Sequence, residues 1–144
     1  MENKKSNLGS TLNTLSLPFA RFSIFVVYFW FGILKIFSKS PANPLVAELL
    51  EKTMPFISFE TFIVLLGLFE IAIGILFLFS RFDNISLVAL TVHLFTTVLP
   101  LVLLPLVAWQ SAFVPTIEGQ YIIKNILIVA VALSIAAHDH PVKA

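Results

Sequence analysis

The sequence predicts an all-α integral membrane protein: a four-helix bundle with a short interfacial amphipathic helix between helices 1 and 2. Three observations predict this class. Of the 144 residues 58% are hydrophobic, only 12% are charged, and long apolar segments separate the charges. The charged fraction is about half that of a typical soluble domain, too low to cover the surface of a soluble fold of this size. We therefore expect residues 1–144 to form a single transmembrane domain surrounded by the lipid bilayer.

A bilayer crossing requires about 20 mostly apolar residues, and four segments meet this requirement. Residues between Arg21 and Lys35 are uncharged and form the centre of the first span, whereas the second span has Glu70 near its middle. Residues 84–117 contain no Asp, Glu, Lys or Arg, and Lys124 lies one turn inside the last span. The predicted spans are residues 17–37, 59–80, 85–108 and 120–137.

The segments between the spans carry helix signals. Asn43 and Pro44 suit the start of a helix, and apolar residues then recur at helical spacing up to Met54. This short helix should lie in the membrane interface, over the bundle. Asp83 could cap the third span, and Pro100 and Pro105 should kink it.

The start of the chain has a second interpretation. Lys4 and Lys5 precede an apolar stretch, as in a cleaved signal peptide. The stretch is long for such a peptide and lacks a small-x-small cleavage site, so we expect it to remain in the mature protein.

Composition excludes several classes of function. The chain has no Cys, which excludes disulfides, thiolate metal sites and cysteine nucleophiles. A net charge of +1 without a concentrated basic face gives no reason to expect nucleic-acid binding. His138 and His140 flank Asp139 near the C-terminus, where we predict no metal site.

The distribution of cations sets the expected orientation. Four spans place both termini on the same side of the membrane. The cations on that side are Lys4, Lys5, Arg21, Arg81 and Lys143, and those on the other side are Lys35, Lys39, Lys52 and Lys124. If Lys35 and Lys124 are embedded, the positive-inside rule favours cytoplasmic termini.

Polar residues inside the spans are the candidate site residues, because a charge there costs about 2.5–3.5 kcal/mol on insertion and usually has a protein partner. Helical spacing puts Arg21, Tyr28, Gly32 and Lys35 on one stripe of the first span, which should therefore face protein. The sequence assigns no catalytic role to any of them, and it favours a non-catalytic membrane subunit over a stand-alone enzyme.

The second span places an acid between small residues. Gly67 and Gly74 flank Glu70 on one face and would let a neighbouring helix approach. His93 should reach a similar depth in the third span, so Glu70 and His93 could be partners. The simpler alternatives are a protonated Glu70 with one interhelical hydrogen bond and a His93 that only satisfies its own hydrogen bonds.

The opposite mouth of the bundle should hold a polar cluster that includes Lys35, Lys124 and Asn125. Glu60 or Glu118 could neutralise either lysine. Both lysines could instead serve as interfacial anchors, as lysines at helix ends often do.

These residues resemble the DoxX-like family of small bacterial membrane proteins with four transmembrane helices. The resemblance rests on Arg21, on FGILK with Gly32 and Lys35, on GLFEIAIG around Glu70, and on GQYIIKN with Lys124. The segment GILKIFSKSPANPLV is also similar to the YkgB-like branch. The resemblance covers nearly the whole chain.

The resemblance implies a location in the bacterial cytoplasmic (inner) membrane and a role as accessory subunit or partner in quinone-linked redox or oxidative-stress metabolism. Quinone is then the candidate ligand, although no cofactor is certain, and a membrane redox complex is the candidate partner. The matching positions are Arg21, Gly32, Lys35, Glu70 and Lys124. The absence of cysteine argues against direct thiol exchange.

Two other functions stay open. Glu70 at mid-membrane could serve the permeation of a small ion or solute, which four helices alone would allow only through a narrow path unless the chain forms a homo-oligomer. The protein could also be a membrane assembly factor without a ligand, whose protein partner would contact residues 45–54 or 110–118.

Overall fold

The computed structural model describes residues 2–139, with the side chains of residues 2–10, 13 and 139 outside that description. Within this range four helical segments are long and apolar enough to cross a membrane. They are Thr14–Ile36, Phe59–Phe77, Ser80–Leu103 and Ile117–His138. The prediction of four membrane-spanning helices is thus confirmed for length and composition, since each segment contains the apolar run that a bilayer requires.

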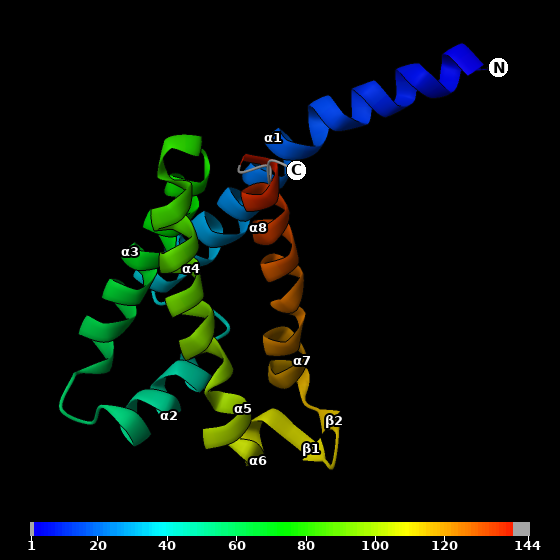
Figure 1. Cartoon of the computed structure of the whole chain (residues 1–144). Coiled ribbons are helices and arrows are strands. Elements are labelled where there is room, and N and C mark those ends of the chain that lie inside the picture. The colour runs from blue at the N-terminus through cyan, green and yellow to red at the C-terminus, as the bar shows by residue number, and fades with distance from the viewer. Residues whose placement is uncertain (1, 140–144) are drawn as a thin grey trace.

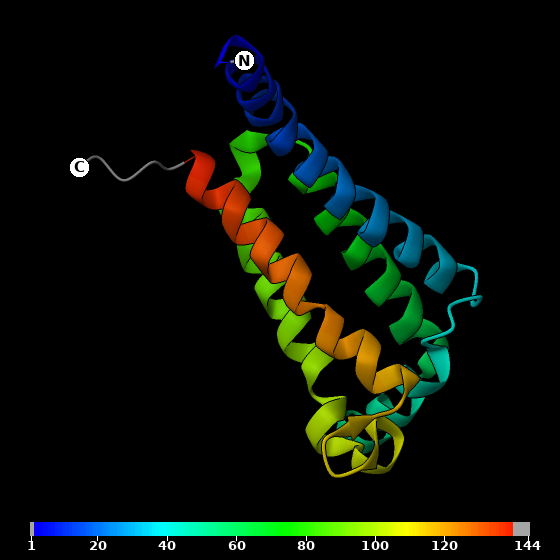
Figure 2. The same ribbon diagram turned by 90° about the vertical axis from the view of Figure 1, so that its right-hand side faces the viewer.

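The first helix, α1 (Glu2–Ile36), is much longer than the predicted span of residues 17–37. Its first part projects beyond the other helices (Figure 1, Figure 2). The segment before Thr14 lies outside the apolar span, but its Glu, Lys and Leu residues favour helix. The helix also continues through Pro18.

The third and fourth spans, predicted over 85–108 and 120–137, are both interrupted. The sequence predicted that Pro100 and Pro105 would disturb the third span, and new helices do begin at these two residues. Helix α4 (Asp83–Val98) is followed by α5 (Pro100–Leu103) and α6 (Pro105–Ala108). Each proline begins a new short helix because it lacks the N–H that would continue the preceding one. The last span divides at Asn125 into α7 (Ile117–Lys124) and α8 (Ile126–Asp139), a break that the sequence did not predict.

The second span is helix α3 (Phe59–Phe77), which ends before the predicted boundary at residue 80 and is followed by the short 3-10 helix η1 (Ser80–Phe82). Ser58 caps α3 by accepting a hydrogen bond from the Thr61 amide. Between α1 and α3 lies α2 (Asn43–Thr53), the short helix that the sequence predicted. Its capping position is Ala42 and not Asn43.

One small sheet departs from the all-α prediction. Strands β1 (Trp109–Ser111) and β2 (Val114–Pro115) pair antiparallel, with Ser111 opposite Val114. Phe113, in the connecting turn, has a φ of 61°. The hairpin links α6 to α7 at the end of the bundle that also holds α2 and α5 (Figure 1).

Two glycines set the close packing of α1 against α3. A Cβ atom on Gly32 would lie 2.6 Å from the carbonyl oxygen of Gly67, and one on Gly67 would lie 2.7 Å from the carbonyl oxygen of Gly32. Any larger residue at either position would push the two backbones apart. A third glycine, Gly74, meets α1 less closely, because a Cβ atom there would lie 3.2 Å from the Phe25 carbonyl oxygen. The predicted packing role of Gly32, Gly67 and Gly74 is thus confirmed, because small residues allow helices to approach in membranes.

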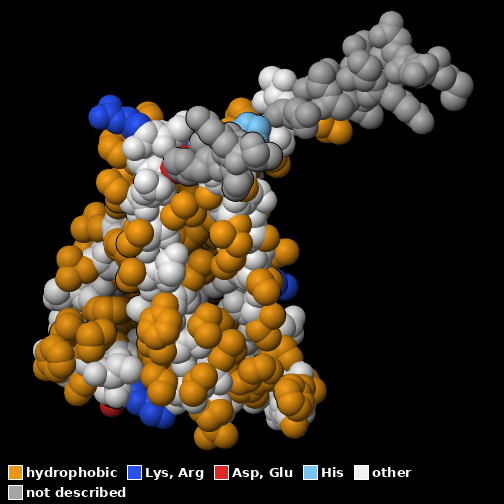
Figure 3. Space-filling view, in the orientation of Figure 1, with side chains coloured by type: hydrophobic (Ala, Val, Ile, Leu, Met, Phe, Trp, Pro, Cys, Tyr) orange, Lys and Arg blue, Asp and Glu red, His pale blue; other side chains and the backbone are white. Residues whose placement is uncertain are grey.

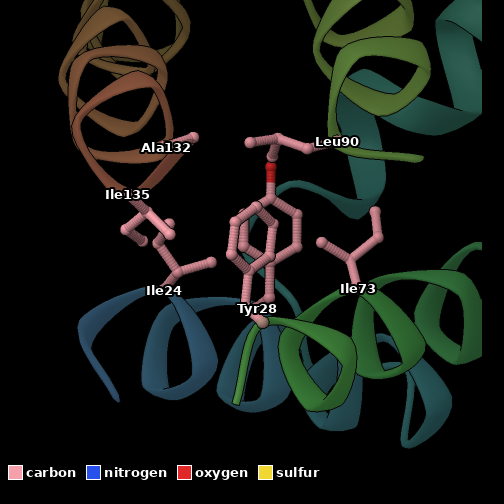
Figure 4. Close-up of a cluster of buried hydrophobic side chains, with 7 residues drawn as sticks. Ile24, Tyr28, Ile73, Leu90, Ala132 and Ile135 are labelled. Carbon is pink, nitrogen blue, oxygen red and sulfur yellow. The ribbon is translucent and has the colours of Figure 1, made fainter. Parts of the chain in front are cut away.

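The buried core joins four helices (Figure 4). Tyr28 of α1 lies in it with Ile24 on one side and Ile73 of α3 on the other, and its hydroxyl end points toward Leu90 of α4. Helix α8 contributes Ala132 and Ile135. The outer surface is also apolar: hydrophobic side chains cover most of the face shown in Figure 3, and most charged side chains on this face lie toward its two ends. A bundle that is apolar inside and outside is typical of a protein surrounded by lipid.

Candidate functional site

The centre of the candidate site is a buried ion pair between α1 and α3. Lys35 Nζ lies 2.9 Å from Glu70 Oε1 and 2.8 Å from Glu70 Oε2, and the two residues are each 5% exposed. Both sit beside the glycine contact of these helices, since the Lys35 Cβ is 3.1 Å from the position of a Cβ on Gly67. The close backbone approach therefore brings the lysine within reach of the carboxylate, and each charge neutralises the other away from water.

His93 of α4 joins this pair. Its Nε2 lies 2.9 Å from Glu70 Oε1, which confirms the predicted partnership of Glu70 and His93. Spans two and three run antiparallel, so residues at similar distances from their shared end meet at one depth. The alternative of a protonated Glu70 with a single interhelical hydrogen bond is wrong here, because the carboxylate contacts both Lys35 and His93.

The contact with Glu70 fixes the direction of both hydrogen bonds of the His93 ring. Glu70 is ionised when paired with Lys35 and can then only accept, so Nε2 of His93 carries a hydrogen. In a neutral ring Nδ1 is then an acceptor, and Tyr28 Oη lies 3.2 Å from it. Thr97 already donates its hydroxyl hydrogen to the His93 carbonyl oxygen at 2.8 Å, so Tyr28 is the donor to Nδ1.

Tyr28, His93, Glu70 and Lys35 thus form one hydrogen-bonded chain across three helices. With a neutral His93 its total charge is zero, which is the arrangement that costs least in a low-dielectric interior. We call these four side chains the polar network. All four were predicted as site residues.

A second buried ion pair lies toward the other end of the bundle. Arg21 donates to both carboxylate oxygens of Asp83 at 2.7 Å, and also to the carbonyl oxygen of Phe77 at 2.9 Å. Phe77 is the last residue of α3 and Asp83 the first of α4, so Arg21 attaches α1 to the connection between them. The bidentate geometry is the strong form of such a pair.

Asp83 is the residue whose role the sequence pattern predicted wrongly. The prediction that it caps the third span fails, because it lies inside α4 and makes no side-chain cap hydrogen bond there. The position of Asp83 just outside an apolar run favours a helix cap, whereas the structure shows that its carboxylate pairs with Arg21. The sequence did contain one sign of this pairing, because an arginine embedded in a span requires an acidic partner.

The predicted polar cluster around Lys124 does not form as expected. Lys124 is exposed, with its Nζ 5.4 Å from the centre of the Tyr121 ring, and Lys35 pairs with Glu70 rather than with Glu60 or Glu118. Lys124 follows the outward face of α7, whereas Asn125, one residue later, is half-buried and lies beside the polar network. Of the two, only Asn125 belongs to the site.

A cavity of about 410 Å³ opens onto the polar network from the side of α2, α3, α4 and α5. Its walls are apolar side chains such as Leu49, Leu66 and Phe69, and Lys35, Glu70 and His93 lie at one part of its lining. Small-molecule sites usually have this volume and this composition, with a few polar groups in an apolar wall. We call it the large cavity.

Among residues 2–139 no group of three or more His, Asp or Glu side chains is placed to hold a metal ion. His140, which the sequence places near His138, lies outside the described residues.

Fold and site together define a bundle of four long apolar helices with an ion-paired polar network beside an apolar cavity. Comparisons with protein-family models, with curated proteins and with solved structures find no match for this chain.

Proposed function

We propose that the protein is a DoxX-like accessory subunit of a membrane redox system and that its large cavity binds a quinone. The observation that supports this proposal is the contact between the large cavity and the polar network. A ligand that enters an apolar cavity of about 410 Å³ meets a few polar side chains, which are those of Lys35, Thr53, Glu70, His93, Thr96 and Thr97. An amphiphile with a compact polar head and an apolar body fits that distribution.

Quinones have the matching chemistry. Their ring carries two carbonyl oxygens that accept hydrogen bonds, and the rest of the molecule is apolar. Lys35 uses two of its N–H donors on Glu70, and an ammonium group has three. The third N–H is the donor that we assign to a quinone carbonyl.

The surroundings of the large cavity also suit a ligand that arrives from lipid. Leu65 and Val92 line it and are 58% and 53% exposed on the outer surface. They lie on α3 and α4, in the part of the bundle that the bilayer would surround. A hydrophobic ligand could therefore enter sideways without crossing water.

The membrane placement that accompanies this function is the bacterial cytoplasmic membrane, with both termini in the cytoplasm. The end of α8 lies at the same end of the bundle as the connection between α3 and α4, opposite α2 and the hairpin (Figure 1). In this placement α2 lies in the interface on the far side. Its Glu48, Glu51 and Lys52 are exposed, whereas Leu50 is buried, the pattern expected of a helix at the boundary between water and lipid.

Redox subunits act with partners, so we also propose that the apolar outer faces contact another membrane subunit or a second copy of this chain. Leu106 and Phe113, at 94% and 95% exposure, are among the most exposed large side chains in the described part of the chain.

The binding test uses the purified protein in nanodiscs and a labelled short-chain quinone. Lys35→Met should weaken binding about tenfold or more, because a hydrogen bond to a charged donor contributes about 1.5–3 kcal/mol. Lys124→Met is the matched control, since it removes an exposed lysine that lies outside the cavity lining, and it should leave the affinity unchanged.

A second variant keeps the ion pair intact. Leu49→Trp fills the large cavity from α2 and should abolish binding, whereas Leu127→Trp, on the exposed face of α8, should not. Binding that equals that of empty nanodiscs, or that is the same in all four variants, would contradict a quinone site and leave the permeation and assembly functions in its place.

A further inference from the structure

A second, smaller cavity lies on the other side of the polar network. Its volume is about 150 Å³, and it lies between α1, α4 and the junction of α7 with α8. Six of its nine lining residues carry polar side chains, which are Tyr28, Lys35, Glu70, His93, Thr97 and Asn125. We call it the small cavity.

The two cavities differ in what they can hold. A polar cavity with several hydrogen-bonding groups and room for more than one water is normally hydrated, whereas an apolar cavity stays dry or takes an apolar ligand. The small cavity is nearer to the first kind than the large one is, with the amide of Asn125 and the hydroxyls of Tyr28 and Thr97 in its wall beside the apolar Val27, Phe31 and Ile128. The large cavity is of the second kind.

Lys35, Glu70, His93 and Thr97 line both cavities. These four side chains therefore lie between the two cavities. The first three are titratable side chains, and they are hydrogen-bonded in series, Lys35 to Glu70 at 2.9 Å and His93 to Glu70 at 2.9 Å.

The junction of α7 with α8 adds a polar side chain to the small cavity. The backbone of Asn125 keeps helical dihedral angles, with φ −60° and ψ −16°, and its N–H bonds to the Ile122 carbonyl at 3.1 Å. Its own carbonyl accepts from the Ile128 N–H at 3.0 Å. Asn125 is half-buried and lies in the wall of the small cavity, where its side-chain amide can hydrogen-bond to water.

We infer that the small cavity is a water-filled vestibule that delivers protons to Glu70 and His93 from the α7–α8 side. The ligand of this site is water together with the protons that it carries. The inference deepens the proposed function and rests on it for the destination of the proton, which is an oxygen of the ligand in the large cavity. Hydration of the vestibule does not depend on any ligand.

The proton transfer conserves atoms and charge. A hydronium ion formed in bulk solvent passes its proton along the vestibule waters to a Glu70 oxygen, so one O–H bond breaks in the donating hydronium, which becomes water, and one forms on the carboxylate. This transfer moves no electron. Glu70 returns to its ionised form when it passes the proton to an oxygen of the quinone, after the membrane redox system of the proposed function has reduced that quinone.

The first experiment measures hydration by water-edited solid-state NMR on the ¹⁵N-histidine-labelled protein in liposomes, without quinone. Magnetisation from water should reach the His93 ring N–H in the unaltered chain. Asn125→Leu, which replaces the amide by an apolar group of similar size, should slow this transfer about tenfold. The matched control is Leu49→Phe, which fills part of the large cavity and should leave the transfer unchanged.

Two outcomes overturn the inference. No transfer from water to His93 in the unaltered chain would show that the small cavity is dry. Transfer that Leu49→Phe removes and Asn125→Leu does not would show that water reaches His93 through the large cavity instead.

The second experiment uses the natural absence of cysteine. Asn125→Cys should react with a small water-soluble methanethiosulfonate about tenfold faster than Leu127→Cys, two residues later on the exposed face of α8. Equal rates would contradict a vestibule even if Asn125→Leu failed to fold. Because neither measurement involves quinone, a dry vestibule and an absent quinone site are separate results.

Discussion

Arg21 and Lys35 are both cations inside a span, and each pairs with a carboxylate from another helix. Arg21 pairs with Asp83 at 2.7 Å and Lys35 with Glu70 at 2.8 Å. The two pairs differ in surroundings. The Arg21 pair joins helix ends, whereas the Lys35 pair continues through His93 to Tyr28 and borders both cavities. This contrast leads us to assign a structural role to the first pair and a functional role to the second.

Loss of one partner from the first pair should strongly destabilise the fold. Arg21→Met leaves the Asp83 charge buried, so the free energy of unfolding in detergent should fall by about 3–5 kcal/mol. Arg81→Met, which removes an exposed arginine from the neighbouring turn, should change it by less than about 1 kcal/mol. The double variant Arg21→Met with Asp83→Leu should recover part of the loss. A cost for Arg21→Met as small as that for Arg81→Met would contradict a structural pair.

The hydrogen-bond directions in the polar network predict one tautomer of His93. We expect a neutral ring with its hydrogen on Nε2, because Glu70 can only accept and Tyr28 donates to Nδ1. The ¹⁵N chemical shifts of the ring report the tautomer directly. Tyr28→Phe should shift the Nδ1 resonance and leave Nε2 protonated; a ring with its hydrogen on Nδ1 alone would reverse the assigned directions.

At the scale of elements, the contact between α1 and α3 positions the site. Gly32 and Gly67 bring the two backbones together, and Lys35 and Glu70 follow each glycine by three residues. The side chains therefore meet because the glycines let the helices touch.

A graded pair of variants tests this packing. Gly67→Ala places a Cβ 2.7 Å from the Gly32 carbonyl oxygen, whereas Gly74→Ala places one 3.2 Å from the Phe25 carbonyl oxygen. We expect Gly67→Ala to destabilise the protein by about 1–3 kcal/mol, as overpacking usually does, and Gly74→Ala to cost less. Unfolding measured in the same detergent gives the comparison, and equal costs would show that α1 and α3 can separate freely.

At this scale the sequence could predict the features that apolar length or helical spacing determines, and it could not predict those that depend on which way a side chain turns. Apolar length revealed the spans, and helical spacing revealed the inward positions of Tyr28 and Glu70. The pairing of Lys35 with Glu70 was missed because the lysine lies at the end of its helix, where its long side chain can turn either way. The break at Asn125 was missed because Asn between apolar residues carries no strong helix-ending signal, unlike Pro100.

For the whole molecule, the proposed membrane placement has the two ends of the bundle facing different compartments. The connection between α3 and α4 lies at one end, with the end of α8, and the hairpin lies at the other (Figure 1). The apolar surface between them (Figure 3) is what the bilayer would cover.

Single-cysteine labelling tests this topology on a chain without native cysteine. In right-side-out vesicles, Ser111→Cys in the hairpin should react with an impermeant maleimide, and Ser80→Cys in η1 should react only after permeabilisation. Inside-out vesicles should reverse the pattern if the termini are cytoplasmic. Equal labelling of both positions from one side would contradict the crossing of the membrane by the third span, Ser80–Leu103.

The central claim is that the large cavity beside the polar network holds a quinone, and the most direct measurement is photo-crosslinking with an azidoquinone followed by peptide mass spectrometry. We predict adducts on cavity-lining residues such as Leu49, Phe69 and Val92, suppressed by excess unlabelled quinone and about tenfold or more weaker in Lys35→Met at subsaturating probe. Adducts confined to outward residues such as Phe95 and Leu127, and unaffected by competitor, would contradict the claim.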